Sequence, residues 1–495
     1  MIKKLLLFIF VFQISLLFAQ NTGVLKGKIV DAKTREFLPY VNILVTGTNL
    51  GAVSNDKGEF EITNVPLGYV SIQVSFLGYI TSFSEDYLVT NDKTPFILIE
   101  LNQNTEVLNE VMVVSNPFQK NIETPLSKQS LGIVEIEKNP GGNRDVLKVI
   151  QSLPGVASNP GFRNDIIIRG GSPSENKFYL DGIEVPVINH FQTQGSTGGP
   201  VGIINADLIR NVDFYTSSFQ ANRGNALSSI IEFTQKDGNP DKLNTRATLG
   251  TSDAGITLDG PINNKTSFIL SARQSYLQLL FKLIKLPFLP TYNDFQLKVK
   301  HQLSPKSEIS IIGLGAIDKF KLNTEVNNNV TDIDVLKRNN YILSNIPVQE
   351  QWNYTIGASY KHFAKNSTQQ LVVSRNEWEN EAKKYFNNTN SPTDLLLNYS
   401  SKEVENKLRF ENTISTEHNY KINIGAGVEN AIYTNATYQK IASTSGVSEI
   451  DFSSEITLVK YSLFGQISKK YLNSKLGTSV GFRMDGLDYN SEMSN

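Results

Sequence analysis

The residue types that most often perform catalysis are sparse in this sequence and poorly spaced for it. The chain has no cysteine and only four histidines, so disulfides and cysteine-based metal sites are excluded. None of the histidines has the HxxE or HExxH spacing of a zinc site; they are His190, His301, His362 and His418. Gly23–Lys28 lacks the spacing of a phosphate loop, and Gly313–Asp318 lacks the last glycine of a dinucleotide motif. We therefore expect no enzyme, no cofactor and no bound metal.

Instead, runs of roughly ten residues in the C-terminal half of the chain alternate apolar and polar side chains. In the segment 404–414, one set is apolar and the other is charged: Val404, Leu408, Phe410 and Ile414 against Glu405, Lys407, Arg409 and Glu411. Thr266–Tyr276 and Gly477–Asp485 show the same alternation less sharply, with serine, glycine and a few charged residues on the polar face. Because side chains of a strand alternate between its two faces, each segment predicts a strand with one lipid-like face and one wet face.

About eleven such strands are expected, with boundaries good to a few residues. They lie near 243–250, 253–260, 266–276, 292–302, 307–318, 352–363, 367–376, 404–414, 420–431, 457–468 and 474–485. Short turns alternate with long links, and the long links are 277–291, 319–351, 377–403 and 432–456. This rhythm is typical of an outer-membrane β-barrel, in which short turns are periplasmic and long loops extracellular. A soluble β-sandwich, whose strands also alternate, is the alternative.

An odd number of strands is unusual for a single-chain bacterial barrel. The sequence also ends in a polar tail, Glu492–Asn495, directly after a strand. We expect a C-terminally truncated chain that holds the first half of a larger barrel. Its first and last strands should then be unpaired edges of the sheet.

The charge balance argues against one class of partner, and the N-terminus indicates export. The 495 residues include 47 basic and 48 acidic side chains, a balance that gives no support for nucleic-acid binding. Residues 1–19 read as a signal peptide, with Lys3 and Lys4 before an apolar run and a cleavage site before Gln20. A membrane anchor is the alternative at this end.

Residues 22–101 read as an independent β-domain. Short strand-like runs alternate with turns rich in Gly, Pro, Asn and Asp, such as Asn55–Gly58 before the strand that begins at Glu59. The pattern from Gly27 to Tyr79 resembles the carboxypeptidase-regulatory-like family, a transthyretin-like sandwich. The resemblance implies a folding and docking unit, not a peptidase.

A polar linker, residues 102–121, follows this domain and contains one short apolar strand. The strand consists of Glu110, Val111, Met112, Val113 and Val114. An exposed extended segment of this kind suits strand addition to the sheet edge of a partner. The alternative is that it forms the last strand of the preceding sandwich.

The most specific stretch runs from about residue 122 to 236. It contains "GGNRDVLKVIQSLPG" (Gly141–Gly155), which predicts an amphipathic helix, then "IIIRGGSPSENKFYLDGIEVP", "NHF" and "LIRNVDFYTSSFQANRGNALSSIIEF". These motifs resemble the plug domain of TonB-dependent outer-membrane receptors, in the Bacteroidota arrangement with a regulatory-like domain in front. The motif residues that match are Arg169, Gly170, Gly171, Asp181, Gly182, Arg223 and Gly224.

Physical reasoning on the same stretch agrees with a plug. Gly170, Gly171 and Gly182 permit tight turns and close backbone approach. Four arginines could pair with acidic groups of the barrel lumen such as Glu405 and Glu411, or alternatively within the plug; they are Arg144, Arg163, Arg169 and Arg223. Ion pairs in a wet lumen are individually weak, so they would hold a plug reversibly.

The expected fold is therefore mainly β. It comprises a small sandwich, a mixed α/β plug domain, and about eleven strands of an antiparallel transmembrane barrel over residues 240–495. The resemblance implies an outer-membrane importer that binds a scarce solute, siderophore-like or another large molecule, and is energised by TonB, with residues 110–114 as the TonB box. The alternatives are a glycan importer that works with a surface lipoprotein, and a non-transporting receptor or adhesin. The expected partners are TonB with its inner-membrane complex, outer-membrane lipid and the solute.

The expected loop 277–291 is oddly apolar for an exposed segment. Its sequence, LQLLFKLIKLPFLPT, contains only two charges. We expect it either to fold over the plug or to lie at the membrane interface.

Overall fold

The chain, described by a computed structural model, divides into two compact units, Met1–Pro117 and Phe118–Asn495. The described residues are 22–91, 94–103, 123, 128–139, 145–158, 163–194, 196, 198–416, 418, 420–443, 446–472 and 476–494. The expected signal peptide, the strand Glu110–Val114 and Arg144 lie outside these residues.

The first unit is a β-sandwich, as its turn-rich pattern predicts. Three strands pair in the order β4-β1-β9 and four in the order β3-β2-β6-β7, with a separate pair β5-β8. Alternate residues of β1 are buried, and Leu25 packs with Ile43 and Ile72 of the other sheet in one apolar cluster. The strands are β1 Thr22–Asp31, β2 Asn42–Val45, β3 Gly51–Val53, β4 Glu59–Pro66, β5 Gly68–Val70, β6 Ile72–Ser75, β7 Ser82–Phe83, β8 Tyr87–Val89 and β9 Phe96–Leu101.

The second unit begins with a mixed α/β domain, which covers the expected plug. Its main sheet has the order β10-β17-β18-β13-β14, in which β13 and β18 run parallel and the other neighbours antiparallel. The elements are β10 Lys128–Gly132, α2 Ile133–Lys138, α3 Val146–Ile150, β11 Val156–Ser158, β12 Ile166–Ile168, η1 Pro173–Glu175, β13 Asn176–Leu180, β14 Ile183–Glu184, β15 Asn189–His190, β16 Val201–Gly202, η2 Ala206–Leu208, β17 Ile209–Tyr215 and β18 Ser229–Gln235.

The amphipathic helix of this domain is shorter than its sequence pattern predicts. Helix α3 begins at Val146, because Asp145 has an extended backbone and its carboxylate accepts a hydrogen bond from the Leu147 N–H at 3.0 Å. The apolar side chains Val146, Val149 and Ile150 are buried as expected. The helix ends at Ile150, and the chain continues in turns.

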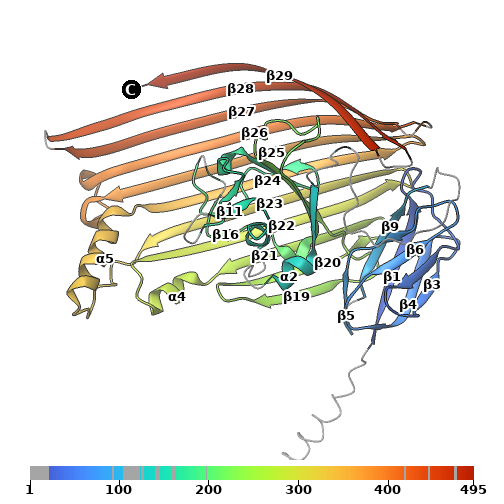
Figure 1. Cartoon of the computed structure of the whole chain (residues 1–495). Helices are drawn as coiled ribbons and strands as arrows, with labels where there is room; N and C mark the ends of the chain where they lie inside the picture. The colour runs from blue at the N-terminus through green and yellow to red at the C-terminus, as the bar shows by residue number, and fades with distance from the viewer. Residues whose placement is uncertain are drawn as a thin grey trace, which may run out of the picture. The chain divides into compact units, whose positions relative to one another are not determined.

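An antiparallel sheet of eleven strands completes the unit, and each strand pairs with its neighbours in chain order (Figure 1). The expectation of about eleven strands with short turns between alternate pairs is confirmed, and β19 and β29 are the two edges of the described sheet. The strands are β19 Asn244–Leu249, β20 Asp253–Asn263, β21 Thr266–Ser275, β22 Phe288–Ser304, β23 Ser307–Leu322, β24 Val348–Phe363, β25 Ser367–Tyr385, β26 Leu395–Ser415, β27 Tyr420–Ser443, β28 Gly446–Tyr471 and β29 Leu476–Ser494. Short helices in the links are α4 Leu277–Leu283, α5 Ile333–Asn345, η3 Phe386–Asn388 and η4 Pro392–Asp394.

Two of the four expected long loops are wrong. Most of 377–403 and 432–456 belongs to long strands, which continue as paired hairpins beyond the amphipathic stretch, for example from Lys384 to Leu397. Backbone pairing sustains these extensions, and both of their faces carry polar residues. The periodicity of apolar side chains along the sequence therefore could not predict these strand extensions.

The predicted division of the strand faces is confirmed. Leu408 and Phe410 are about half exposed on one face of β26, while Lys407, Arg409 and Glu411 contact the α/β domain from the other. Exposed apolar side chains recur on other strands of the sheet, as on β29 at Val480, Phe482 and Met484. No helix among the described residues is both long and apolar enough to cross a membrane.

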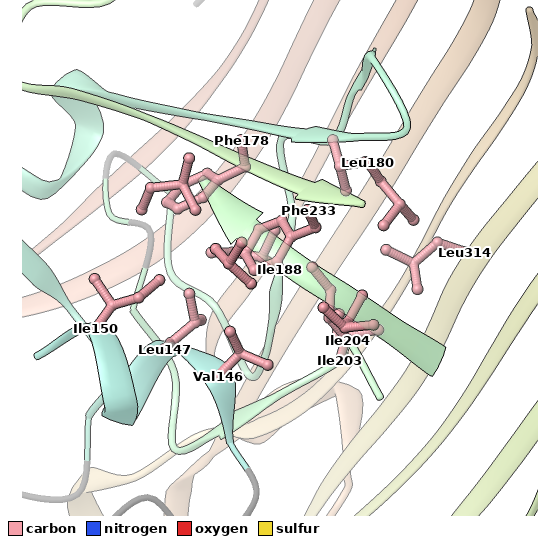
Figure 2. Close-up of a cluster of buried hydrophobic side chains, with 14 of the residues drawn as sticks. Val146, Leu147, Ile150, Phe178, Leu180, Ile188, Ile203, Ile204, Phe233 and Leu314 are labelled. Carbon is pink, nitrogen blue, oxygen red and sulfur yellow. The ribbon is translucent and has the colours of Figure 1, made fainter. Parts of the chain in front are cut away.

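The α/β domain packs against the inner face of the sheet through apolar side chains as well. A continuous cluster joins Phe178, Leu180 and Phe233 of this domain to Leu314 of β23 and Val372 of β25. Figure 2 shows Leu314 facing Leu180 across this contact. Burial of this cluster holds the domain against the sheet, and polar contacts then define its position.

Candidate functional site

The most enclosed polar contact between the α/β domain and the sheet is built on His190. Its Nδ1 lies 2.6 Å from Oδ1 of Asp318 on β23, and its Nε2 lies 3.0 Å from Oδ2 of Asp294 on β22. All three side chains are almost fully buried. We call these three residues the His190 clamp.

The clamp holds a charged imidazole. Both ring nitrogens face carboxylates, which requires a proton on each nitrogen. Burial alone would lower the pKa of His190, but Asp318 and Asp294 raise it to about 9. The Tyr292 ring stacks on the imidazole with centroids 4.2 Å apart.

Arg273 of β21 extends the clamp to a second segment of the α/β domain. Its Nε donates to Asp294 at 2.9 Å, and its Nη2 donates to the backbone carbonyls of Gly202 and Ile203, each at 2.8 Å. One guanidinium therefore joins a wall carboxylate to the strand β16 that pairs with β15.

Two lysines of β22 bind acidic groups at the end of the α/β domain. Lys298 lies 3.1 Å from Asp181 and 2.8 Å from Asp237, and Lys300 lies 2.9 Å from Asp237. Burial would raise the pKa of Asp237, but the two ammonium groups hold it well below its usual range. These contacts place the turn at Asp181–Gly182 against the wall.

A third group of charges surrounds Arg223 and Glu411. The Arg223 guanidinium lies over the Tyr179 ring at 4.6 Å, and it pairs with Glu232 at 2.6 Å and with Glu411 of β26 at 3.5 Å. Arg409 also binds Glu411 at 2.6 Å and donates to the Gly182 carbonyl at 2.7 Å. Arg223 thus meets both predicted alternatives, because it pairs with the sheet through Glu411 and within the α/β domain through Glu232.

Next to this group, Lys407 of β26 joins acidic residues of both parts. It lies 2.9 Å from Glu184 and 2.8 Å from Glu405, and Glu184 also binds Lys177 at 3.0 Å. Burial would raise the pKa of Glu184, but Lys177 and Lys407 hold it far below its usual range. The predicted acidic lumen group Glu405 thus meets the plug through a lysine and not through an arginine.

Two of the other predicted arginines, Arg163 and Arg169, lie among the described residues, and both pair within the α/β domain. Arg163 binds Asp165 at 2.6 Å, and Arg169 donates to the Thr216 hydroxyl at 3.3 Å. For these two arginines the structure shows the alternative, pairing within the plug, and not pairing with the lumen.

The motif glycines act as expected, through conformation or close approach. Gly170 and Gly182 have φ of +84° and +82°, a region that favours glycine. A Cβ at Gly171 would collide with Ser228, and one at Gly224 with the Arg483 guanidinium.

Sequence reasoning did not single out His190 or its partners Asp294, Asp318 and Arg273 as site residues. The available signal was the alternation of charged and apolar residues on the strands, which places Arg273 and Asp294 on inner faces. It could not indicate which plug residue they would meet. Among the described residues, no cluster of histidines and carboxylates is arranged to hold a metal ion.

Two family models match the chain. Residues 25–113 match the CarboxypepD_reg-like domain, and residues 120–230 match the TonB-dependent Receptor Plug Domain. The first match includes Glu110–Val113, so the alternative that this strand completes the sandwich stays open.

Individual relatives agree with these domains. The chain is 26% identical over 213 residues to a TonB-dependent receptor of Formosa agariphila, a match that covers 41% of this chain and 19% of that protein. A ferric enterobactin receptor of Pseudomonas aeruginosa, solved with enterobactin, is similar in fold with a TM-score of 0.52 and 14% identity. That match covers 74% of this chain and 60% of the receptor. The chain therefore spans less than two thirds of the length of each of these relatives.

Proposed function

We propose that this chain, which carries the regulatory-like and plug domains of TonB-dependent receptors, acts as an outer-membrane receptor that imports a large solute by energised movement of its plug. The proposal assigns residues 122–236 to the plug and 240–495 to the barrel. The observation that carries it is the charged inner wall, which binds the α/β domain through Lys298, Lys407 and the His190 clamp.

This contact is suited to a gate. A solute cannot pass while the plug occupies the wall, so work must be done to move the plug. Polar contacts can re-form with water when the plug shifts, whereas a purely apolar contact would expose its surface. The outer membrane has no ATP, so the energy must come from an inner-membrane complex through TonB.

Glu110–Val114 is the proposed site of TonB docking by strand addition. Val113→Pro removes a backbone donor and should abolish uptake while leaving assembly intact. Val113→Ala, which keeps the donor, is the matched control. Uptake of a radiolabelled ferric catecholate is one probe and uptake of an oligosaccharide is the other, with assembly checked by heat-dependent migration on gels.

The result separates the alternatives. Normal uptake by the proline variant contradicts TonB docking at this strand. If the variant fails to assemble, the strand belongs to the sandwich. Solute binding without any uptake by the parent favours a non-transporting receptor or adhesin, and oligosaccharide uptake that depends on a surface lipoprotein favours a glycan importer. Induction by iron starvation or by a carbon source would narrow the solute class further.

A further inference from the structure

The short turn that carries His190 contacts several strands of the sheet. This turn, residues 189–194, is held at His190 by β22 and β23. The Gln192 carbonyl accepts a hydrogen bond from Gln351 of β24 at 2.9 Å, and Gln194 donates to Glu403 of β26 at 2.9 Å. The Phe191 N–H donates to Asp318 at 2.7 Å, with Phe191 in a left-handed conformation of φ +53°.

A row of phenylalanines connects the same turn to the apolar link that contains α4. Phe191 meets Phe320 edge-on, with centroids 6.5 Å apart, and Phe320 stacks on Phe288 at 5.4 Å. Phe288 in turn meets Phe281 of α4 at 5.6 Å. Release of the turn would therefore remove Phe191 from the end of a row of aromatic contacts that reaches the link helix.

Charge balance distinguishes the clamp from these neutral contacts. Asp294 and Asp318 carry two negative charges, and the ionised His190 with Arg273 carries two positive charges. A further acid, Asp253, acts on Arg273 and accepts a hydrogen bond from the Tyr292 hydroxyl at 2.7 Å. If His190 loses its proton, a buried carboxylate is left without its partner charge, and such a state is strongly disfavoured.

We propose that ionised His190 is the residue that positions the 189–194 turn on the barrel wall, so that the turn detaches when the imidazole loses its charge or its carboxylates. The role of this anchoring in transport rests on the proposed function. The anchoring itself does not, because it requires no solute and no energy.

The expected pH dependence follows from the raised pKa of His190. A group whose pKa is higher in the folded than in the unfolded protein contributes its full stability below its ordinary value, near 6.5, and loses it as pH rises through the folded value. Anchoring should therefore be firm below pH 6.5 and should weaken as pH passes about 9.

The test is a spin label on the turn. The chain has no cysteine, so Thr193→Cys, at an exposed position, gives a single labelling site in the full chain in liposomes. In this background the label should be immobile at pH 6 and gain a mobile component with a midpoint near pH 9. His190→Gln should be mobile at every pH. His362→Gln, which removes a ring that faces the Ser307 hydroxyl at 2.9 Å, is the matched control and should behave like the parent.

Asp318→Asn provides a second variant should His190→Gln fail to assemble. It keeps an acceptor for the Phe191 N–H but removes one charge, so the midpoint should fall by at least about one pH unit, a tenfold change in proton affinity. An immobile label in His190→Gln, or an unchanged midpoint in Asp318→Asn, would overturn the proposal. Because the measurement uses no solute and no TonB, its outcome is independent of whether the protein transports.

Discussion

Gly171 is the motif residue at which a single methyl group should matter most. Its missing Cβ leaves room for the Ser228 side chain and for Glu175, which are hydrogen-bonded to each other. Gly171→Ala should destabilise the plug by about 2 kcal/mol, because the added atom overpacks a short side chain that has little room to move. At Gly170 an added Cβ would meet open space. Gly170→Ala should therefore lower the stability of the plug only by the left-handed backbone strain, about 1 kcal/mol.

Urea-dependent exposure of a buried plug residue measures this difference. Val212, fully buried on β17, can be replaced by cysteine in the cysteine-free chain and followed by maleimide reaction. An equal shift of the urea midpoint for the two alanine variants would contradict the close contact at Gly171.

At the scale of single elements, the exposure of helix α4 bears on whether the apolar link 277–291 is covered. None of its side chains is buried, and Leu279, Leu283 and Ile284 are mostly exposed, with Leu283 at 78%. The expectation that this link folds over the plug is therefore not met at these side chains. Among the described residues, a row of phenylalanines connects the link to the plug.

Leu283→Cys should react rapidly with a water-soluble maleimide in intact outer membranes. Leu343→Cys on α5, where the side chain is 8% exposed, is the buried comparison and should react at least about tenfold more slowly. If Leu283→Cys reacts as slowly as this comparison, lipid or a partner covers α4, and the membrane-interface alternative gains support.

The strands of the sheet also show which parts of an element the side-chain periodicity can predict. The amphipathic part of each strand could be predicted, because one face must meet an apolar environment while the other meets the plug. The hairpin extensions of β25 to β28 could not, because no apolar face is required where both sides of a strand carry polar residues. The lengths of these extensions depend on backbone pairing between neighbouring strands. The side-chain periodicity of one segment does not predict that pairing.

At the scale of the whole molecule, the plug is held by buried charges that depend on one another. Lys407, with its side chain 13% exposed, faces three acidic residues, Glu184, Glu405 and Glu429. Lys407→Met leaves these carboxylates without their shared cation, and the plug should lose about 3 kcal/mol of stability. Lys460→Met removes a more exposed partner of Glu429 and should cost less than about 1 kcal/mol.

The same Val212→Cys assay reports both lysine variants. Lys407→Met should become reactive at clearly lower urea concentration, whereas Lys460→Met should stay close to the parent. Equal effects of the two would mean that apolar burial alone holds the plug against the wall.

The sequence by itself determined the β-rich architecture, the number of long strands, the faces they present and the resemblance to plugged receptors. These properties are local, because side-chain period, turn residues and short motifs lie within a few positions of one another. Only the tertiary structure decided which charges meet. His190 lies 104 residues from Asp294 and 128 from Asp318, and Arg223 pairs with Glu411 while Arg163 and Arg169 stay within the plug. Such partners depend on how the plug docks onto the inner face of the sheet, and no spacing along the chain encodes that directly.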